Sequence, residues 1–200
     1  MNDIFARNTD GMTERLSRAV IGIAGCGGIG SNAAVSLVRA GIGKIIIADF
    51  DIVEASNLNR QNYFTQDIGK VKVSALKEIL LQINPDCVVE AVEKEVGRND
   101  IAEIFGEADI MIEAFDKAES KEWLIEEWAT LFPEKPVISG NGLSGFGDFA
   151  SLKVKRADNI WFCGDGTTSS ESGLCSARVA IVSNMQANLA IELLMNNKEC

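Results

Sequence analysis

Short apolar runs alternate with stretches of helical periodicity along most of the chain. The runs over residues 20–24, 44–49 and 109–115 are almost free of polar side chains, which is typical of strands buried on both faces. Between the first two runs, apolar residues recur at every third or fourth position, as on the buried face of an amphipathic helix. This stripe consists of Ile29, Ala33, Leu37 and Ala40.

The same alternation continues to about residue 140. A second apolar stripe, ended by Pro85, predicts a helix, and the segments 87–92 and 137–139 predict further strands. Asn99 is the expected N-cap of a short helix, and a longer helix is expected over 118–131. The order of these elements predicts an α/β fold with a Rossmann-like, mostly parallel sheet flanked by helices. The second stripe consists of Val73, Leu76, Leu80 and Ile83.

The texture changes after Gly140, where glycine and small polar residues become frequent. Two antiparallel strands are expected near 147–154 and 159–163. A final helix is expected over about 176–195, because its apolar residues again recur at helical spacing. We therefore expect antiparallel strands to be added to the sheet in the C-terminal third of one domain of 200 residues.

Composition excludes several kinds of chemistry. The chain contains no histidine, so a Ser-His-Asp triad and histidine acid–base catalysis are impossible. Its five cysteines form no Cys-x-x-Cys pair, so no zinc is expected. An odd number of scattered cysteines is typical of a reduced, cytoplasmic protein.

Charge and hydropathy narrow the range of partners. The formal net charge is −10, which argues against nucleic acid as a partner and favours a protein with a neutral or basic face. The apolar runs span only a few residues, whereas a membrane span needs about 20, so no membrane association is expected. The first twenty residues carry charges where a signal peptide would be apolar, so none is expected.

The first predicted strand runs into a glycine-rich turn that opens the first predicted helix. Gly25, Gly27 and Gly30 form the pattern G-x-G-x-x-G, and Gly28 adds a fourth glycine. In such a turn the backbone approaches a phosphate closely, and the free N–H groups of the helix supply positive potential. Asp49 ends the next strand, where an acid accepts hydrogen bonds from ribose hydroxyls. The pattern predicts an adenine-nucleotide site without saying which nucleotide binds.

The segment that follows this acid carries polar residues that hydride transfer does not use. Asn57, Arg60 and Gln61 are expected in a loop at the carboxyl end of the sheet, where ligands bind in this architecture. Lys72 begins the following helix, and Asp116 ends a later strand at the same edge. Two cations and a carboxylate suit a magnesium-bound triphosphate, because the cations offset phosphate charge and the acid holds the metal. An NAD-binding oxidoreductase or sensor, which needs only a diphosphate, is the alternative.

These residues together resemble the ThiF/MoeB/ubiquitin-activating-enzyme superfamily, whose members are adenylyltransferases that activate ubiquitin-like sulfur carriers. The resemblance runs from about residue 5 to residue 195 and is closest to the short bacterial ThiF-type enzymes that act on the sulfur carrier protein ThiS. Its most specific part is the pattern D-x-D-x-V-x-x-S-N-L-x-R-Q over residues 49–61. The other matching segments are Gly25–Ser31, Gly69–Lys72, Phe115-Asp116 and Gln186-Ala187.

The resemblance implies ATP-dependent adenylylation of the C-terminal Gly-Gly carboxylate of the carrier, giving acyl-AMP and pyrophosphate, for thiamine thiazole synthesis. By position, Asp49 would hold the ribose and Asp116 would coordinate Mg²⁺. An arginine from the neighbouring subunit would reach the triphosphate; Arg7 is the candidate, so a homodimer is expected. Arg60, Lys72, Asp116 and Arg7 would then form the catalytic set. The residues that would contact the phosphates are Gly25, Gly27, Gly30, Asn57, Arg60 and Lys72, and Gly28 and Gln61 complete the nucleotide site.

The resemblance also divides the chain and suggests its partners. Residues 1–18 would be an N-terminal arm, 19–140 a nucleotide-binding core, and 141–200 a carrier-binding region with the antiparallel strands and final helix. A sulfur donor protein would be a further partner. A molybdopterin-type carrier would use the same ATP site, and a non-catalytic carrier-binding scaffold is a third reading.

Several positions depart from the family pattern or lie outside it. The zinc-binding Cys-x-x-Cys pairs of longer relatives are absent, and Lys117 stands where relatives usually carry Asn. Cys163 is the best candidate for a cysteine that accepts the activated acyl group or a sulfur. Arg15 and Arg18 are expected to be surface charges. The cysteines expected to serve packing are Cys26, Cys87 and Cys175, and Cys200 has no assigned role.

Overall fold

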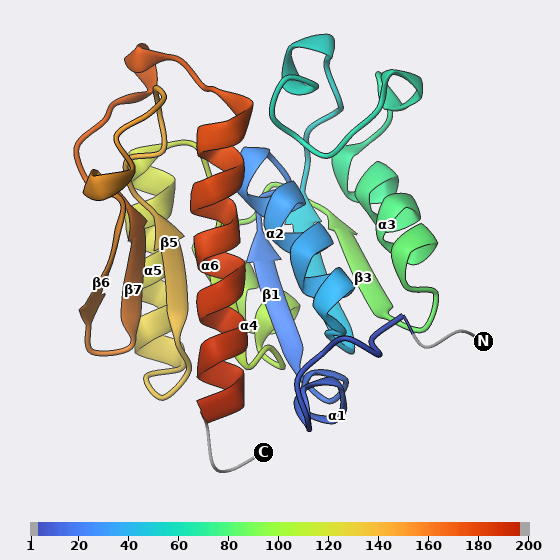
Figure 1. Ribbon diagram of the computed structural model, residues 1–200. Helices are drawn as coiled ribbons and strands as arrows, with labels where there is room; N and C mark the ends of the chain where they lie inside the picture. The colour runs from blue at the N-terminus through green and yellow to red at the C-terminus, as the bar shows by residue number, and fades with distance from the viewer. Residues whose placement is uncertain (1–3, 197–200) are drawn as a thin grey trace.

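A seven-stranded sheet forms the centre of the computed structural model, which describes residues 4–196 (Figure 1). The strand order is β3-β2-β1-β4-β5-β7-β6, and every neighbouring pair is parallel except β6 with β7. This confirms the predicted Rossmann-like α/β fold. The strands are β1 (Val20–Ala24), β2 (Lys44–Asp49), β3 (Val88–Glu93), β4 (Ile110–Glu113), β5 (Val137–Gly140), β6 (Lys153–Ala157) and β7 (Ile160–Gly164).

Helices cover both faces of the sheet. One apolar cluster joins α2, α3 and α6 to one face, and a second joins α4 and α5 to the other face. Figure 1 shows the first three helices in front of the sheet and the other two behind it, with α1 below. The helices are α1 (Met12–Leu16), α2 (Gly28–Ala40), α3 (Lys72–Ile83), α4 (Ile101–Phe105), α5 (Ala118–Leu131) and α6 (Ser176–Asn196).

The alternating side chains of the central strands explain the two clusters. Ile45 and Ile47 of β2 belong to the α2 side, whereas Ile46 belongs to the α4 side. All three are completely buried, as a strand between two helical layers requires. On the α4 side, Trp128 is also completely buried and donates its indole N–H to the Lys135 carbonyl oxygen at 3.0 Å.

Two local predictions are wrong. The strand expected near 147–154 begins only at Lys153, because Gly147 and Asp148 have φ angles of 71° and 45° and break the extended backbone. Asn99 does not cap the short helix. Residues 98–100 form a 3₁₀ turn in which the Asp100 carboxylate accepts the Gly97 N–H at 2.9 Å, and α4 starts after it.

The sheet order places a ligand crevice at one edge. The chain leaves β1 toward β2 and β3 on one side and returns to β4 on the other side of β1. Loops therefore diverge at the carboxyl ends of β1 and β4, and open α/β sheets bind ligands at such a point. Within residues 4–196, no helix is both long and apolar enough to cross a membrane.

Candidate functional site

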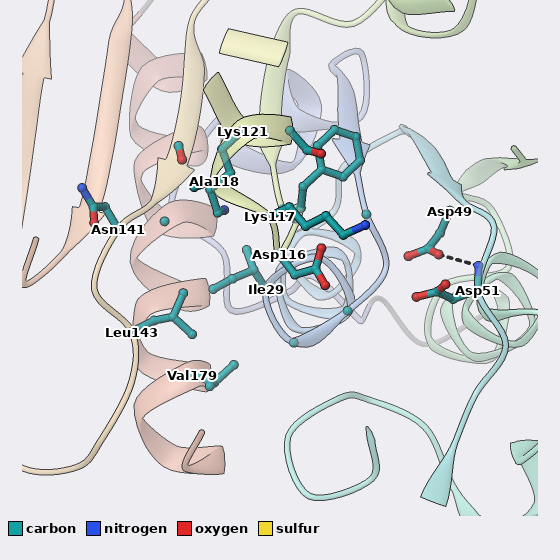
Figure 2. A pocket seen from close by; sticks show the side chains of 18 of the residues that line it. Ile29, Asp49, Asp51, Asp116, Lys117, Ala118, Lys121, Asn141, Leu143 and Val179 are labelled. Atoms are coloured by element: carbon teal, nitrogen blue, oxygen red, sulfur yellow. Dashed lines mark hydrogen bonds between the residues drawn. The ribbon is translucent and has the colours of Figure 1, made fainter. Parts of the chain in front are cut away.

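A cavity of about 920 Å³ opens at the carboxyl edge of the sheet. Every residue expected in the nucleotide and metal site lines it, apart from Gly30 and Arg7. Figure 2 shows Asp49 on one side, Leu143 on the other, and Asp116 with Lys117 between them. The expected residues that line the cavity are Gly25, Gly27, Gly28, Asn57, Arg60, Gln61, Lys72, Asp49 and Asp116.

The glycine turn is shaped by close backbone packing. Gly25 has a φ of +101°, and a Cβ there would lie 2.7 Å from the Ala114 carbonyl oxygen. A Cβ on Gly30 would lie 1.8 Å from the Gly25 carbonyl oxygen, so Gly30 allows α2 to pack against its own entry turn rather than lining the cavity. Gly27 caps α2 without a side-chain hydrogen bond, which leaves first-turn N–H groups available to an anion.

Asp49 is held in place by backbone donors. Its Oδ2 accepts the Cys26 N–H at 2.6 Å, and its Oδ1 accepts the Asp51 N–H at 2.8 Å (Figure 2). The residue is 9% exposed, and each oxygen retains a lone pair that a ligand hydroxyl can use. The carboxylate therefore joins the β1–α2 turn to the end of β2 in a fixed orientation.

The cations beside the turn differ in their partners. Lys72 is buried, and its Nζ lies 2.7 Å from Asp51 Oδ2. The Arg60 guanidinium donates to the carbonyl oxygen of Ser56 at 3.0 Å and to Asn59 Oδ1 at 2.8 Å, both uncharged groups. Its positive charge is therefore not balanced by these partners.

Two amides complete this wall of the cavity. Asn57 Oδ1 accepts the Glu54 N–H at 3.0 Å, which fixes the 3₁₀ turn Ala55–Asn57. Gln61 is 9% exposed, and its Oε1 is buried with no hydrogen-bond partner among the described residues. A buried amide oxygen without a partner costs free energy, so a bound ligand would relieve that cost here.

A buried polar network that the sequence analysis missed lies beneath Asp116. Glu113 is completely buried; its carboxylate accepts the Phe115 N–H at 2.7 Å and the Ser139 hydroxyl at 2.6 Å. Lys121 balances the charge, with Nζ 2.9 Å from Glu113 Oε2. The network joins the ends of β4 and β5 to α5 and so fixes the turn that carries Asp116. Glu113, an acidic residue within an otherwise apolar predicted strand, was the sequence feature that could have revealed this network.

Arg7 lies at the far end of the molecule from this cavity. Its neighbour Asn8 donates to the Ala40 carbonyl oxygen at 2.9 Å, at the C-terminal end of α2. The glycine turn is at the other end of α2, which spans 13 residues, or about 20 Å at 1.5 Å per residue. Arg7 is exposed, so the chain does not bring it to its own cavity. Arg15 is half-buried instead of being a simple surface charge, whereas Arg18 is exposed.

Comparison with known proteins places the chain in a family. The model of the ThiF family matches residues 3–200. The chain belongs to the ThiF family. This membership confirms the resemblance to the ThiF/MoeB/ubiquitin-activating-enzyme superfamily.

Curated relatives and solved structures agree with this assignment. A probable molybdopterin-synthase adenylyltransferase of Porphyra purpurea is 30% identical, over 92% of this chain and 50% of its own length. The adenylyltransferase and sulfurtransferase UBA4 of Scheffersomyces stipitis is 32% identical, over 76% of this chain and 37% of its own length. The chain thus spans half or less of these relatives. The crystal structure of E. coli tRNA N6-threonylcarbamoyladenosine dehydratase in complex with ATP shares the fold, with a TM-score of 0.82 and 23% sequence identity. The match covers 93% of this chain and 89% of that structure's chain.

The cysteines of this ThiF-family chain are free thiols in the described part. Cys163 is completely buried, and burial raises its pKa to about 12, so the thiol stays protonated near neutral pH. Burial likewise raises the pKa of Cys26 and of Cys87, the latter to about 11. These properties argue against Cys163 as an acyl or sulfur acceptor. Cys175 is exposed instead of packed, and Cys200 lies outside the described residues.

A second missed cluster fastens the C-terminal loops of this ThiF-family chain. Asp165 and Arg178 form an ion pair at 2.6 Å, with side chains 3% and 4% exposed. Burial alone would raise the pKa of Asp165, but the N–H groups of Thr168 and Thr167 and the Arg178 guanidinium hold it well below its usual range. Arg178 also donates to the Gly147 carbonyl oxygen. One guanidinium thus ties two loops to α6.

The burial of Cys163, Cys26 and Cys87 can be tested directly by thiol labelling. Brief treatment of the native protein with iodoacetamide at pH 8 should label Cys175, while Cys163, Cys26 and Cys87 remain unmodified, because a buried protonated thiol is a poor nucleophile. Peptide mapping by mass spectrometry reads out each site, and urea-unfolded protein is the control in which all four react. Rapid native labelling of Cys163 would contradict the assignment.

The Asp165–Arg178 pair predicts a large stability effect. Replacing Arg178→Met leaves a buried carboxylate without its cation, so the free energy of unfolding at pH 7 should fall by about 3–5 kcal/mol. Urea unfolding measures this change, and Arg39→Met, at an exposed position on α2, is the matched control.

The pH dependence follows from the lowered pKa of Asp165. A carboxylate whose folded pKa is depressed stabilises the protein above its unfolded pKa of about 3.9, and this contribution disappears as the pH falls further. The difference between wild type and Arg178→Met should therefore shrink below about pH 4. A difference that is constant down to pH 2.5 would contradict the ion-pair explanation.

Proposed function

We propose that this chain is an ATP-dependent adenylyltransferase that activates the C-terminal carboxylate of a ubiquitin-like sulfur carrier protein. The observation that carries the proposal is the convergence of the glycine turn, the fixed Asp49 and the cations Arg60 and Lys72 on one cavity. Family membership supports it, as do curated relatives named adenylyltransferases. The four described cysteines are free thiols, which favours a reducing compartment such as the cytoplasm.

ATP would lie along the turn between β1 and α2. Asp49 would accept hydrogen bonds from the ribose hydroxyls, and Gly25, Gly27 and Gly28 would let the phosphates approach backbone N–H groups. Arg60 and Lys72 would contact the triphosphate from the facing loop. Gln61, whose Oε1 has no partner in the described residues, would bind the same ligand.

Asp116 fits a magnesium ligand. It is exposed, lines the cavity and lies in the turn between β4 and α5, and the structure gives its carboxylate no hydrogen bond or ion pair within residues 4–196. Mg²⁺ keeps several waters and is held by one or two carboxylates together with substrate phosphates, so a dedicated cage is not required. A bound Mg²⁺ would neutralise phosphate charge beside Asp116.

The other half of the cavity suits an extended peptide tail. Gly140, Asn141 and Gly142 line it, and Leu143 and Val179 supply apolar contacts. A Cβ on Gly142 would lie 2.1 Å from Asp165 Oδ1, and one on Gly140 would lie 2.8 Å from Gln186 Nε2. This wall therefore presents main chain to the cavity, which a tail of small residues can follow closely.

The reaction requires no acid or base from the protein. A carboxylate oxygen of the tail attacks the α-phosphorus of ATP, a new P–O bond forms, and the bond to the bridging oxygen breaks as pyrophosphate leaves. The carboxylate is already ionised near neutral pH, so the chain contributes positioning and charge stabilisation. This mechanism is compatible with a sequence that lacks histidine.

The carrier and the assembly belong to the proposal. We favour ThiS, and thus thiamine thiazole synthesis, because of the resemblance to short ThiF-type enzymes; a molybdopterin-type carrier remains the alternative that the relatives' names favour. A homodimer would allow the exposed Arg7 of one protomer to reach the triphosphate of the other. A sulfur donor protein would act after the activation step. The NAD-binding alternative is weakened because it assigns no task to Arg60 or Asp116.

Adenylylation can be detected directly. Incubation with Mg-ATP and purified ThiS should shift the ThiS mass by one AMP moiety, and the molybdopterin-type carrier is tested in parallel. Asp116→Ala should abolish Mg-dependent ATP–pyrophosphate exchange, because the proposed metal contact is lost, while Glu103→Ala on the surface of α4 should leave it unchanged. Exchange at the wild-type rate in Asp116→Ala would refute the metal role.

Arg60 provides a test of charge stabilisation. Arg60→Ala should lower kcat/KM for adenylylation by about 100-fold or more, as removal of one preorganised donor to developing charge does. Steady-state pyrophosphate release measures the loss, and Arg39→Ala is the control for removal of an exposed arginine. An unchanged kcat/KM would remove Arg60 from the mechanism.

A further inference from the structure

The cations that line the cavity are not equivalent, because most of them already have a carboxylate partner. Lys72 pairs with Asp51 at 2.7 Å, Lys94 with Asp100 at 2.6 Å, and Lys121 with Glu113 at 2.9 Å. The cavity-lining cations with no carboxylate partner among the described residues are Arg60 and Lys117.

Lys117 sits where a lysine has no local structural use. It is the N-cap of α5, with φ −87° and ψ 132°, and it makes no side-chain capping hydrogen bond. Ser, Thr, Asp and Asn are favoured at this position because they accept first-turn N–H groups, and a cation at a helix N-terminus opposes the helix dipole. A residue whose type is unfavourable at its position, and which makes no stabilising contact there, is a candidate functional residue.

The geometry directs the Lys117 side chain into the cavity. Its backbone is fixed because the Lys121 N–H donates to the Lys117 carbonyl oxygen at 3.0 Å. Figure 2 shows the side chain extending from the Asp116 wall across the cavity toward the side of Asp49 and Asp51. The ammonium group thus projects into the space between the β4–α5 turn and the nucleotide half of the cavity.

The charge balance of the cavity indicates what this ammonium group binds. Carboxylates line the same space, and ATP would bring about four further negative charges at neutral pH. Arg60 stands beside the glycine turn, since a Cβ on Gly28 would lie 3.7 Å from Arg60 Cγ. Lys117 stands on the wall formed by the turn between β4 and α5, next to Asp116 (Figure 2). The lining carboxylates are Asp49, Asp51, Glu95, Asp116, Glu122 and Glu126.

We propose that Lys117 is a further phosphate-binding residue, which contacts the β- or γ-phosphate of ATP from the β4–α5 wall. The inference rests on the proposed nucleotide site and adds to it a cation supplied by the same chain. Lys117 and Arg60 then hold the triphosphate from two sides, while the ribose is held by Asp49. The ammonium group acts as a point charge with three donors, which suits phosphate.

Nucleotide titration without any carrier tests the inference. Isothermal titration of Lys117→Met should show ATP affinity reduced about tenfold or more, as expected for loss of a hydrogen bond to a charged group, with AMP affinity within about twofold of wild type. The difference in ATP affinity between wild type and Lys117→Met should become smaller at about 0.5 M salt, because screening weakens the contact that the wild-type lysine makes. Lys77→Met, an exposed lysine of α3 outside the cavity, is the control and should match wild type.

Lys117→Asn separates binding from helix stability. Asn is a good N-cap, so the melting temperature should equal or exceed that of wild type, while ATP affinity falls as in Lys117→Met. Wild-type ATP affinity in both variants, or equal losses for ATP and AMP, would overturn the inference. A wild-type protein that binds ATP but adenylylates no carrier would overturn the proposed function alone; one that binds no nucleotide would overturn both.

Discussion

The carboxylate of Asp49 is the contact on which the site depends. It accepts N–H groups from Cys26 in the β1–α2 turn and from Asp51 after β2, so it links these two loops through one side chain. The Tyr63 hydroxyl extends this chain by donating to the Cys26 carbonyl oxygen at 2.8 Å, and Asp51 extends it to Lys72. Burial raises the pKa values of Tyr63 and Cys26, so both side chains stay protonated near neutral pH.

Local ion pairs hold several of the charged side chains in and around the cavity. Glu113 and Lys121 neutralise each other beneath Asp116, and Asp165 and Arg178 do so beside α6. A buried ion pair contributes little to net stability compared with apolar packing, but it fixes geometry when all its hydrogen bonds are made. The pairs therefore hold the walls of the cavity in place, and the cations Arg60 and Lys117, which have no carboxylate partner among the described residues, remain available for a ligand.

The sequence was sufficient to predict the sheet and to select the glycine turn, Asp49 and Arg60 as neighbours at its carboxyl edge, because local sequence patterns determine these features. The apolar run of β2 ends at Asp49, and the glycine spacing after β1 allows only a turn into a helix. The sequence could not reveal the partners of Glu113 and Arg178. Ser139 lies 26 residues from Glu113, and Gly147 lies 31 residues from Arg178, so these contacts exist only once the sheet and α6 are assembled.

Backbone packing and side-chain charge have separate tasks in this cavity. A Cβ on Gly25 or on Gly142 would lie within 2.7 Å of a backbone atom, and both residues have positive φ angles, so main chain that cannot carry side chains forms part of the cavity wall. Charge is supplied by residues at the ends of elements, such as Asp49 and Lys117, whose backbones are fixed by that packing. A change of charge at Lys117, whose side chain makes no hydrogen bond among the described residues, can therefore alter ligand binding without altering the walls, whereas a methyl group on Gly25 or Gly142 would displace the walls themselves.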